Sequence, residues 1–405
     1  MNERIIKRIM LFGMGDICYD TISAFNMKLK AFFEKRGIAS DIIEINGRRG
    51  YSLEIKRCLE TGDYAAAVSF NSAGEGMIRD PEGINLFDRY NVPFFLFLLD
   101  HPMDHYIKIK NGPENMHVIC IDRDHPGYVK KIRPDENKIH FMLLGGSGDD
   151  EYKAETEDEF LNRRCNLSFT GTRNDLSRIE KEILSMEVPF KMIAADLAEL
   201  MLSERSLTND DALVRVLKDH GLENLSDIDF AAMEGMVNKA NLYVRAYVRE
   251  EVVRTLMASD ISFDIFGKGW DELKGEAGKN VRIHGSVSYK DTLMINRNSK
   301  LMLNVMPWFK NGSHDRIPTA MMSGAAVLTD HSKYLDEVLM PADSEDQKLF
   351  FYDISKPEKI CSIVSNIFSD KDFLYKTAIR GQKYAIENMT WEKTAEELMK
   401  YICME

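Results

Sequence analysis

Continuous apolar runs separated by helical patterns constrain the fold of this chain most strongly. In the first half the runs cover residues 5–12, 40–45, 65–70, 93–99 and 117–121, and residues 21–36 between two of them show helical spacing. A strand that is apolar along its whole length is buried on both faces, and helices between such strands are the crossovers of a parallel sheet. The first half therefore predicts an α/β domain.

The same pattern restarts after a polar interruption. Residues 145–164 begin with Gly-Gly-Ser-Gly and continue into an acidic stretch, which is typical of a linker and a solvated helix. Strands are then predicted at 166–171, 261–266, 281–284, 301–305, 326–329 and 349–352, with a helical insertion over about 195–258. Since 405 residues exceed what one core usually holds, we expect two parallel-sheet domains, 1–165 and 166–388.

Composition excludes several classes of partner. The net charge of −12 argues against nucleic acid or an anionic membrane surface. The most apolar stretch, 92–99, is far shorter than the roughly 20 residues of a bilayer span, and the N-terminus lacks the features of a signal peptide. The six cysteines form no CxxC pair and suit a reducing compartment. We expect a cytoplasmic protein without a transmembrane segment or a nucleic-acid partner.

Polar residues at the carboxyl ends of the first predicted strands are candidates for a ligand site, because parallel sheets bind ligands there. A histidine beside a carboxylate can act as a general base; the alternative is that the carboxylate caps the following helix. The glycines either border the cleft or serve an ordinary turn. The catalytic candidates are His101 and Asp100, and the cleft candidates are Gly13, Gly15, Asp16, Ser72 and His105.

A possible metal motif follows the fifth predicted strand. Asp122-Arg123-Asp124 offers two carboxylates at the spacing that divalent ions accept. Such tripeptides are common by chance, and this one lies in the first domain. We therefore expect no metal site.

The most informative stretch of the second half is a polar loop that feeds an apolar helix. The loop Asn311–Arg316 follows a buried strand and leads into small and Met residues, then Gly324. Unpaired N–H groups where a loop enters a helix attract anions, and an arginine can bind a phosphate through two hydrogen bonds. The pattern predicts a phosphate contact at Arg316.

This stretch resembles the donor-binding region of glycosyltransferases of the two-Rossmann (GT-B) fold, and is most similar to their CgeB-like, spore-maturation-protein group. The resemblance covers most of the chain and includes SFTGTRND (168–175), ISFDIFGKGWDEL (261–273) and YAIENMTWEKTAEELM (384–399). The N-terminal half, with FFLFLLDHP (94–102), resembles the acceptor-side domain less sharply. The resemblance implies two Rossmann-like domains facing across a cleft, with a helix at 389–405 that crosses back to the first domain.

The resemblance also implies donor contacts in the second domain. They are Gly171, Thr172, Arg173, Gly267, Lys268, Gly269, His284, Gly285, Ser286, Val287, Asn311, Gly312, Ser313, His314, Asp315, Arg316 and Thr319. The sequence departs from the family at Thr319 and Asn311, where many relatives carry acidic residues that bind the donor ribose. Both residues can still hydrogen-bond hydroxyls, but neither brings charge.

The resemblance leads us to expect a metal-independent transferase that moves a sugar from a nucleoside-diphosphate sugar, with a UDP-sugar favoured as co-substrate and no cofactor. The acceptor class stays open between a glycan, a lipid-linked sugar and a protein. Two alternatives remain: an inert nucleotide-sugar-binding partner of another transferase, which the departures at Thr319 and Asn311 motivate, and a sugar epimerase on the same fold.

Overall fold

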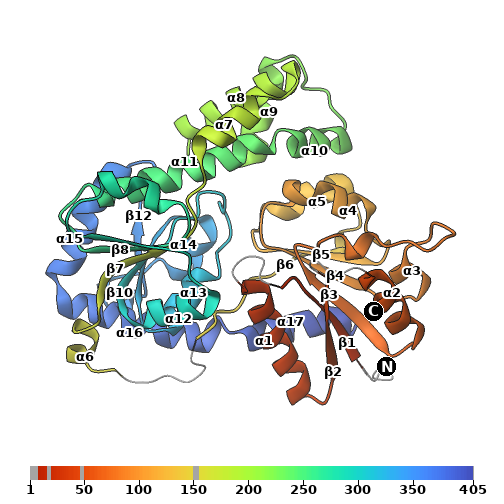
Figure 1. The fold of residues 1–405 in the computed structure, drawn as a ribbon, viewed down its shortest axis with the longest axis horizontal. Coiled ribbons are helices and arrows are strands. Elements are labelled where there is room, and N and C mark those ends of the chain that lie inside the picture. The colour runs from red at the N-terminus through yellow and green to blue at the C-terminus, as the bar shows by residue number, and fades with distance from the viewer. Residues whose placement is uncertain (1–7, 16–19, 46–49, 149–154, 405) are drawn as a thin grey trace. The chain divides into compact units, whose positions relative to one another are not determined.

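The computed structural model describes residues 8–15, 20–45, 50–148 and 155–404, which form two compact units (Figure 1). The first unit comprises Met1–Leu144, Ser226–Gly235 and Trp391–Glu405, and the second comprises Gly145–Leu225 and Met236–Thr390. No helix in the described part of the chain combines the length and the apolar character that a membrane span requires.

The first unit is built on a six-stranded sheet in the order β2-β1-β3-β4-β5-β6, with every neighbouring pair parallel. The strands are β1 (Arg8–Gly13), β2 (Ala39–Glu44), β3 (Tyr64–Phe70), β4 (Phe94–Leu98), β5 (Met116–Cys120) and β6 (Ile139–Phe141). Five of them were predicted, while β6 has only three residues and leaves no apolar run in the sequence.

Helices cover both faces of this sheet, with α4 and α5 on one face and α1 and α17 on the other (Figure 1). The α-helices of the unit are α1 (Thr21–Lys35), α2 (Tyr51–Glu60), α3 (Leu86–Arg89), α4 (Tyr106–Asn111), α5 (His125–Ile132), α10 (Asp227–Met236) and α17 (Trp391–Ile402). The C-terminal helix α17 is part of the core, because the Trp391 ring lies 4.7 Å from that of Phe25 and 6.1 Å from that of Phe70, measured between centroids.

The second unit repeats this architecture with strand order β12-β11-β10-β7-β8-β9, again with every neighbouring pair parallel. Its strands are β7 (Cys165–Thr170), β8 (Phe263–Phe266), β9 (Val281–His284), β10 (Ser299–Leu303), β11 (Ala326–Asp330) and β12 (Phe350–Tyr352). The prediction of two α/β domains with parallel sheets is therefore confirmed.

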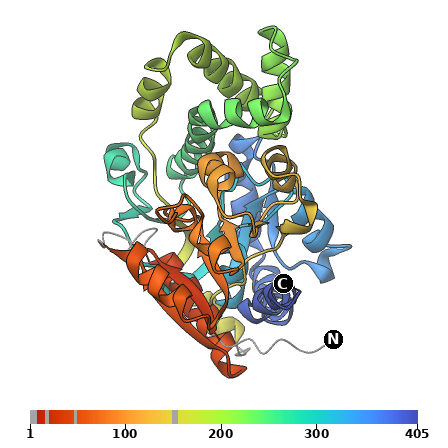
Figure 2. The ribbon, with the colours of Figure 1, turned by 90° about the vertical axis from the view of Figure 1, so that its right-hand side faces the viewer.

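The helices of the second unit fall into a layer on the sheet and a group that packs on α11. The latter group includes α7 and α8, and it is drawn in yellow-green in the upper part of Figure 2. The α-helices are α6 (Glu157–Leu161), α7 (Leu176–Leu184), α8 (Val188–Ser203), α9 (Asn209–Asp219), α11 (Asn238–Met257), α12 (Tyr289–Arg297), α13 (Arg316–Met322), α14 (Lys333–Leu339), α15 (Ile360–Ser369) and α16 (Lys371–Asn388).

The boundaries of the units differ from the expected ones at two places. The first unit ends at Leu144 rather than at residue 165, because Phe160 is buried in the second core and Arg163 donates to the Ser299 and Gly324 carbonyls at 2.8 and 3.0 Å. The insertion is also not wholly part of the second unit, since Ser226–Gly235 joins the first.

A pair of buried histidines connects the first sheet to α17. Nδ1 of His117 lies 2.9 Å from Nε2 of His140, and the His140 ring stacks on Tyr401 at 3.8 Å between centroids. Burial, together with the neighbouring His117, lowers the pKa of His140 from 6.5 to about 4.

We expect acid to destabilise the first unit through this pair. The unfolded chain takes up the His140 proton near pH 6.5 and the folded chain only near pH 4, so stability present above pH 6.5 is lost as the pH falls towards 4. His140→Phe keeps the stacking on Tyr401 and removes the titration. Urea unfolding between pH 7 and 4.5 should show a shallower loss in the variant, and equal pH slopes in both proteins would contradict the assignment.

Candidate functional site

Two backbone loops crowd together at the carboxyl end of the second sheet. The loop after β8 passes the loop after β7 so closely that a Cβ on Gly267 would lie 2.1 Å from the Gly171 carbonyl oxygen, and one on Gly269 would lie 2.7 Å from that of Arg173. Both glycines have positive φ angles, 142° and 90°. The buried Trp270 indole donates to the Gly171 carbonyl at 2.7 Å. These glycines are therefore required by the approach of the two loops.

The side chain of Arg173 is engaged by carboxylates from two other elements. Its Nε donates to Glu250 on α11 at 2.8 Å, and its Nη1 donates to Glu272 at 2.6 Å. The side chain is only 12% exposed. The predicted donor contact Arg173 thus lies within an internal ion-pair network that neutralises its charge.

The neighbouring predicted contacts differ in exposure. Lys268 is exposed at the tip of its loop, as are Gly285 and Ser286 after β9. His284 stacks on Phe266 at 4.2 Å between centroids, and its Nε2 lies 2.9 Å from the buried Asp264 carboxylate. The stacking and the carboxylate fix the His284 ring at the start of this exposed turn.

Hydrogen bonds connect the polar loop after β10 to residues at and just after the end of β11. Asp330 accepts a hydrogen bond from the Met306 backbone N–H at 2.8 Å, and the Ser332 hydroxyl donates to the Gly312 carbonyl at 2.7 Å. Burial raises the pKa of Asp330 to about 6, although the hydrogen bond from the Met306 N–H opposes the rise. The loop is therefore a fixed part of the domain.

Charged side chains of this loop interact with one another. His314 Nδ1 lies 2.7 Å from the Asp315 carboxylate, and both residues are largely buried. Burial lowers the pKa of His314, and the positive charges of Arg316 and Arg249 lower it further. The pKa of Asp315 falls despite its burial, because His314 and Arg316 stabilise the carboxylate.

Two arginines that the sequence analysis missed approach the same loop from α11. The guanidinium carbons of Arg245 and Arg249 each lie 5.1 Å from the centroid of the Trp308 ring. The two arginines are four residues apart, so they share one face of the helix. That spacing was visible in the sequence, but no motif connected α11 to the loop.

Thr319, a predicted donor contact, is buried against the Gly-rich segment before α6. It is 2% exposed, and its hydroxyl accepts a hydrogen bond from the Ser147 N–H at 3.1 Å. The expected linker packs here, since a Cβ on Gly146 would lie 2.7 Å from Pro318 and one on Gly148 would lie 2.7 Å from Met322. The Gly-rich segment therefore covers α13 closely.

In the first unit the early glycines meet the end of β2. A Cβ on Gly13 would lie 2.2 Å from the Glu44 carboxylate, which also accepts a hydrogen bond from the Gly15 N–H at 3.2 Å. Asp16 lies outside the described residues.

The turn after β3 gathers several buried polar groups. Asn71 donates to the Asp100 carboxylate at 3.0 Å, and Asn71 and the buried Ser72 both adopt positive φ angles. Lys108 Nζ lies 3.2 Å from His105 Nδ1. Burial and this ammonium group lower the pKa of His105 to about 4. His105 is therefore neutral at pH 7.

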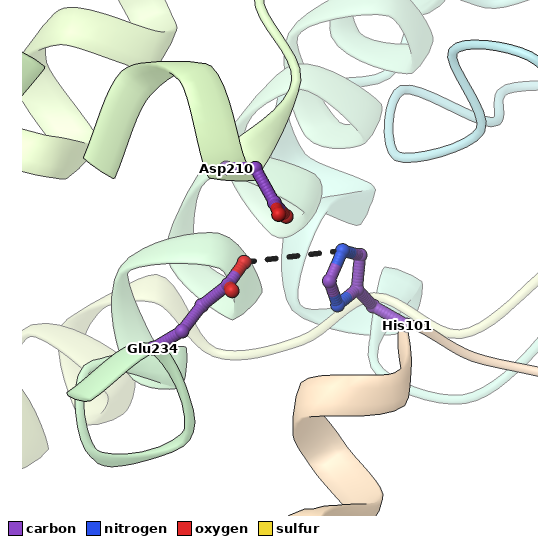
Figure 3. A group of neighbouring side chains, drawn as sticks. All are labelled: His101, Asp210 and Glu234. Carbon is purple, nitrogen blue, oxygen red and sulfur yellow. Dashed lines mark ion pairs between the residues drawn. The ribbon is translucent and has the colours of Figure 1, made fainter. Parts of the chain in front are cut away.

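The imidazole of His101 has a buried carboxylate neighbour on α10, in addition to Asp100 beside it in the chain. Its Nδ1 accepts a hydrogen bond from the Met103 N–H at 3.2 Å, so His101 caps the short 3-10 helix Pro102–His105 in the place considered for Asp100. Its Nε2 lies 4.0 Å from Oε1 of Glu234 (Figure 3). Asp210, also drawn there, belongs to the second unit.

The tripeptide considered for a metal serves the start of α5. Asp122 is buried, and its carboxylate accepts a hydrogen bond from the Asp124 N–H at 2.8 Å. This contact gives the Asp122 carboxylate a local structural role.

We expect the crowded loops to tolerate no side chain at Gly267. Gly267→Ala places a Cβ against the Gly171 carbonyl and forces a strained backbone, and should lower the free energy of unfolding by about 3 kcal/mol or more. The matched control is Gly275→Ala, whose Cβ meets open space and should change it by about 0.5 kcal/mol or less. Chemical denaturation measures both, and equal stabilities would show that the loops separate easily.

Comparisons with known proteins agree with this architecture. Residues 245–400, which include the two α11 arginines and the loop, match the family described as glycosyl transferase-like. No curated protein matches the sequence.

Solved structures resemble this chain in fold. HepE from Anabaena in complex with UDP-glucose has a TM-score of 0.55 at 8% identity, covering 98% of this chain and 100% of its own. Sucrose-phosphate synthase from Thermosynechococcus elongatus has a TM-score of 0.56 at 9% identity, covering 97% and 98%. A glycosyltransferase from Rickettsia africae has a TM-score of 0.53 at 8% identity, covering 98% of each chain. The chain therefore has the GT-B fold of glycosyltransferases, and its residues 245–400 match a glycosyl transferase-like family.

Proposed function

We propose that the protein is a metal-independent glycosyltransferase that moves a hexosyl or N-acetylhexosaminyl group from a nucleoside-diphosphate sugar to an acceptor hydroxyl. The observation that carries this proposal is the convergence of Arg249 and Arg316 on the buried His314–Asp315 pair, within the stretch that matches the transferase family. A UDP-sugar is the favoured donor, because HepE, which has the same fold, is bound to UDP-glucose.

The reaction creates negative charge on the leaving group. The acceptor oxygen bonds to the anomeric carbon while the bond from that carbon to the diphosphate oxygen breaks, and the electron pair leaves with the nucleoside diphosphate. Fixed guanidinium groups stabilise that charge in the transition state without a cation. Arg316 and Arg249 are the proposed groups, and the exposed Lys268 adds a third positive charge.

The remaining proposed donor contacts lie in the turn after β9 and in the loop after β10. The turn Gly285–Val287, beside the fixed ring of His284, is the proposed edge for the nucleotide base. Gly312 and Ser313 are buried in the loop that carries Arg316, and their backbone is the proposed neighbour of the diphosphate. Arg173 acts indirectly in this proposal, because Glu250 and Glu272 engage its guanidinium.

The acceptor side belongs to the first unit. An inverting reaction needs a base for the acceptor proton, and His101 with Asp100 is the proposed pair; a retaining reaction needs none. The acceptor is a glycan, a lipid-linked sugar or a protein, and the CgeB-like group remains the proposed relationship within the family.

A panel of nucleotide sugars tests the proposal against its alternatives. A transferase slowly releases free nucleoside diphosphate from its donor, since water replaces the acceptor. An inert binding partner, which the uncharged Thr319 and Asn311 favour, binds the donor without releasing it. An epimerase changes the donor sugar with no acceptor present. Absence of binding to every nucleotide sugar would overturn all three.

We expect chelation to leave the protein active. Because arginine and lysine side chains neutralise the negative charge of the diphosphate in this proposal, EDTA should change neither donor affinity nor turnover. Assays with and without EDTA, after dialysis, measure both quantities. Complete loss that Mn²⁺ restores would instead assign a cation to this reaction, with Asp122 and Asp124 as first candidates.

The sharpest test concerns Arg316. A charge-assisted hydrogen-bonded pair with a diphosphate is worth about 1.5–3 kcal/mol, so Arg316→Ala should weaken donor binding about 10- to 150-fold. Arg316→Lys keeps the charge but loses the planar fork, and should recover only part of the affinity.

The matched control is Arg178→Ala, which removes an arginine whose side chain is 77% exposed on α7. Calorimetric titration of a UDP-sugar measures affinity, and the melting temperature reports folding. Wild-type affinity in a folded Arg316→Ala protein would remove Arg316 from the site.

A further inference from the structure

The segment Ser226–Gly235 brings α10 from the middle of the chain into the first unit. The buried Tyr128 hydroxyl on α5 donates to the Ala231 carbonyl at 2.9 Å. The Lys131 ammonium lies 4.8 Å from the centroid of the Phe230 ring. A Cβ on Gly235 would lie 3.5 Å from the Met103 carbonyl oxygen. Helix α10 therefore packs directly against the elements that carry His101.

This packing buries the carboxylate of Glu234 beside an imidazole. Glu234 is 0% exposed and His101 is 5% exposed. Their 4.0 Å separation between Oε1 and Nε2 is an ion-pair distance, longer than a hydrogen bond. A carboxylate so deeply buried is costly without a group that stabilises its charge, and an imidazole can supply one.

The backbone decides which nitrogen of His101 carries the proton. Because Nδ1 accepts the Met103 N–H, the neutral ring must keep its proton on Nε2, the nitrogen that faces Glu234. The ring is therefore oriented from both sides, by a backbone donor at Nδ1 and by a carboxylate near Nε2.

We propose that Glu234 is the positioning residue of His101, which holds the imidazole proton at Nε2 and fixes the orientation of the ring. This inference rests on the proposed function, in which His101 serves the transfer reaction. Held in this way the neutral ring carries its proton on Nε2 and has no free lone pair, because Nδ1 accepts the Met103 N–H. In this inference His101 is a hydrogen-bond donor, and this role replaces the role of base that was proposed above for an inverting reaction.

Other titratable groups of the first unit also face this ring. The His125 and Tyr128 rings on α5 lie 4.5 and 5.6 Å from it between centroids, and Asp100 precedes it in the chain. Two imidazoles so close disfavour a second positive charge. A test must therefore change Glu234 alone and observe His101 directly.

The experiment uses the full-length protein labelled with ¹⁵N-histidine. Proton–nitrogen correlation spectra distinguish the two neutral tautomers and report the imidazole pKa through a pH titration, and His101→Gln identifies the resonance. The variants are Glu234→Gln, which keeps the shape and removes the charge, and Glu234→Asp, which keeps the charge. The control is Asp227→Asn, which removes an exposed carboxylate from the same helix.

We expect the wild-type His101 signal to be the Nε2–H tautomer. Glu234→Gln should lower the pKa of His101 by about 1 unit or more, because an opposite charge within 4–6 Å is lost. Glu234→Asp should restore most of that shift, and Asp227→Asn should match the wild type. An Nδ1–H tautomer in the wild type, or an unchanged pKa in a folded Glu234→Gln protein, would overturn the proposal.

Turnover separates this inference from the proposed function. With an active donor, the pH profile of kcat should move in Glu234→Gln in the direction of the His101 pKa. If no nucleotide sugar is turned over, the proposed function fails, while the spectra still decide whether Glu234 positions His101. If turnover is found and the spectra do not change, the positioning role fails alone.

Discussion

Parallel pairing of the strands is the constraint on which the other features of both units depend. A parallel strand cannot be reached from its neighbour through a tight turn, so the chain returns by a crossover and every strand ends at the same edge of its sheet. This geometry places the loops after β7, β8, β9 and β10 beside one another, although up to about 140 residues separate them. The same rule brings the turns after β3 and β4 together in the first unit, where Asn71 reaches Asp100.

Within the second unit, the charged partners of the arginines differ. The Arg173 guanidinium is balanced by Glu250 and Glu272, so it fixes the loop after β7 to α11. Arg249 and Arg316 act together on His314, and their combined field lowers its pKa. The sequence does not show which arginine is paired with carboxylates, because the partners lie on other elements of the fold.

Most of the fold was predictable because it depends on local patterns, whereas much of the site was not. Apolar runs located eleven strands, and only the three-residue β6 left no signal. The site depends on partners far apart in sequence: Glu272 lies 99 residues from Arg173, and Ser147 lies 172 residues from Thr319. Glu234 was also missed, since nothing in its helical pattern indicates that α10 joins the first unit. Pairings of this kind follow from tertiary packing, which a single sequence does not display.

The position of α17 has a consequence for how the chain is made. The rings of Phe25 and Phe70 are covered by Trp391, and His140 is covered by Tyr401. Those covering residues emerge from the ribosome about 250 residues after Leu144, which corresponds to roughly 10–50 s of translation. Throughout that interval the nascent first unit presents an aromatic surface with its own cover not yet synthesised. Chaperones that bind exposed apolar side chains therefore have access to this surface until the twelve-residue helix α17 has been synthesised.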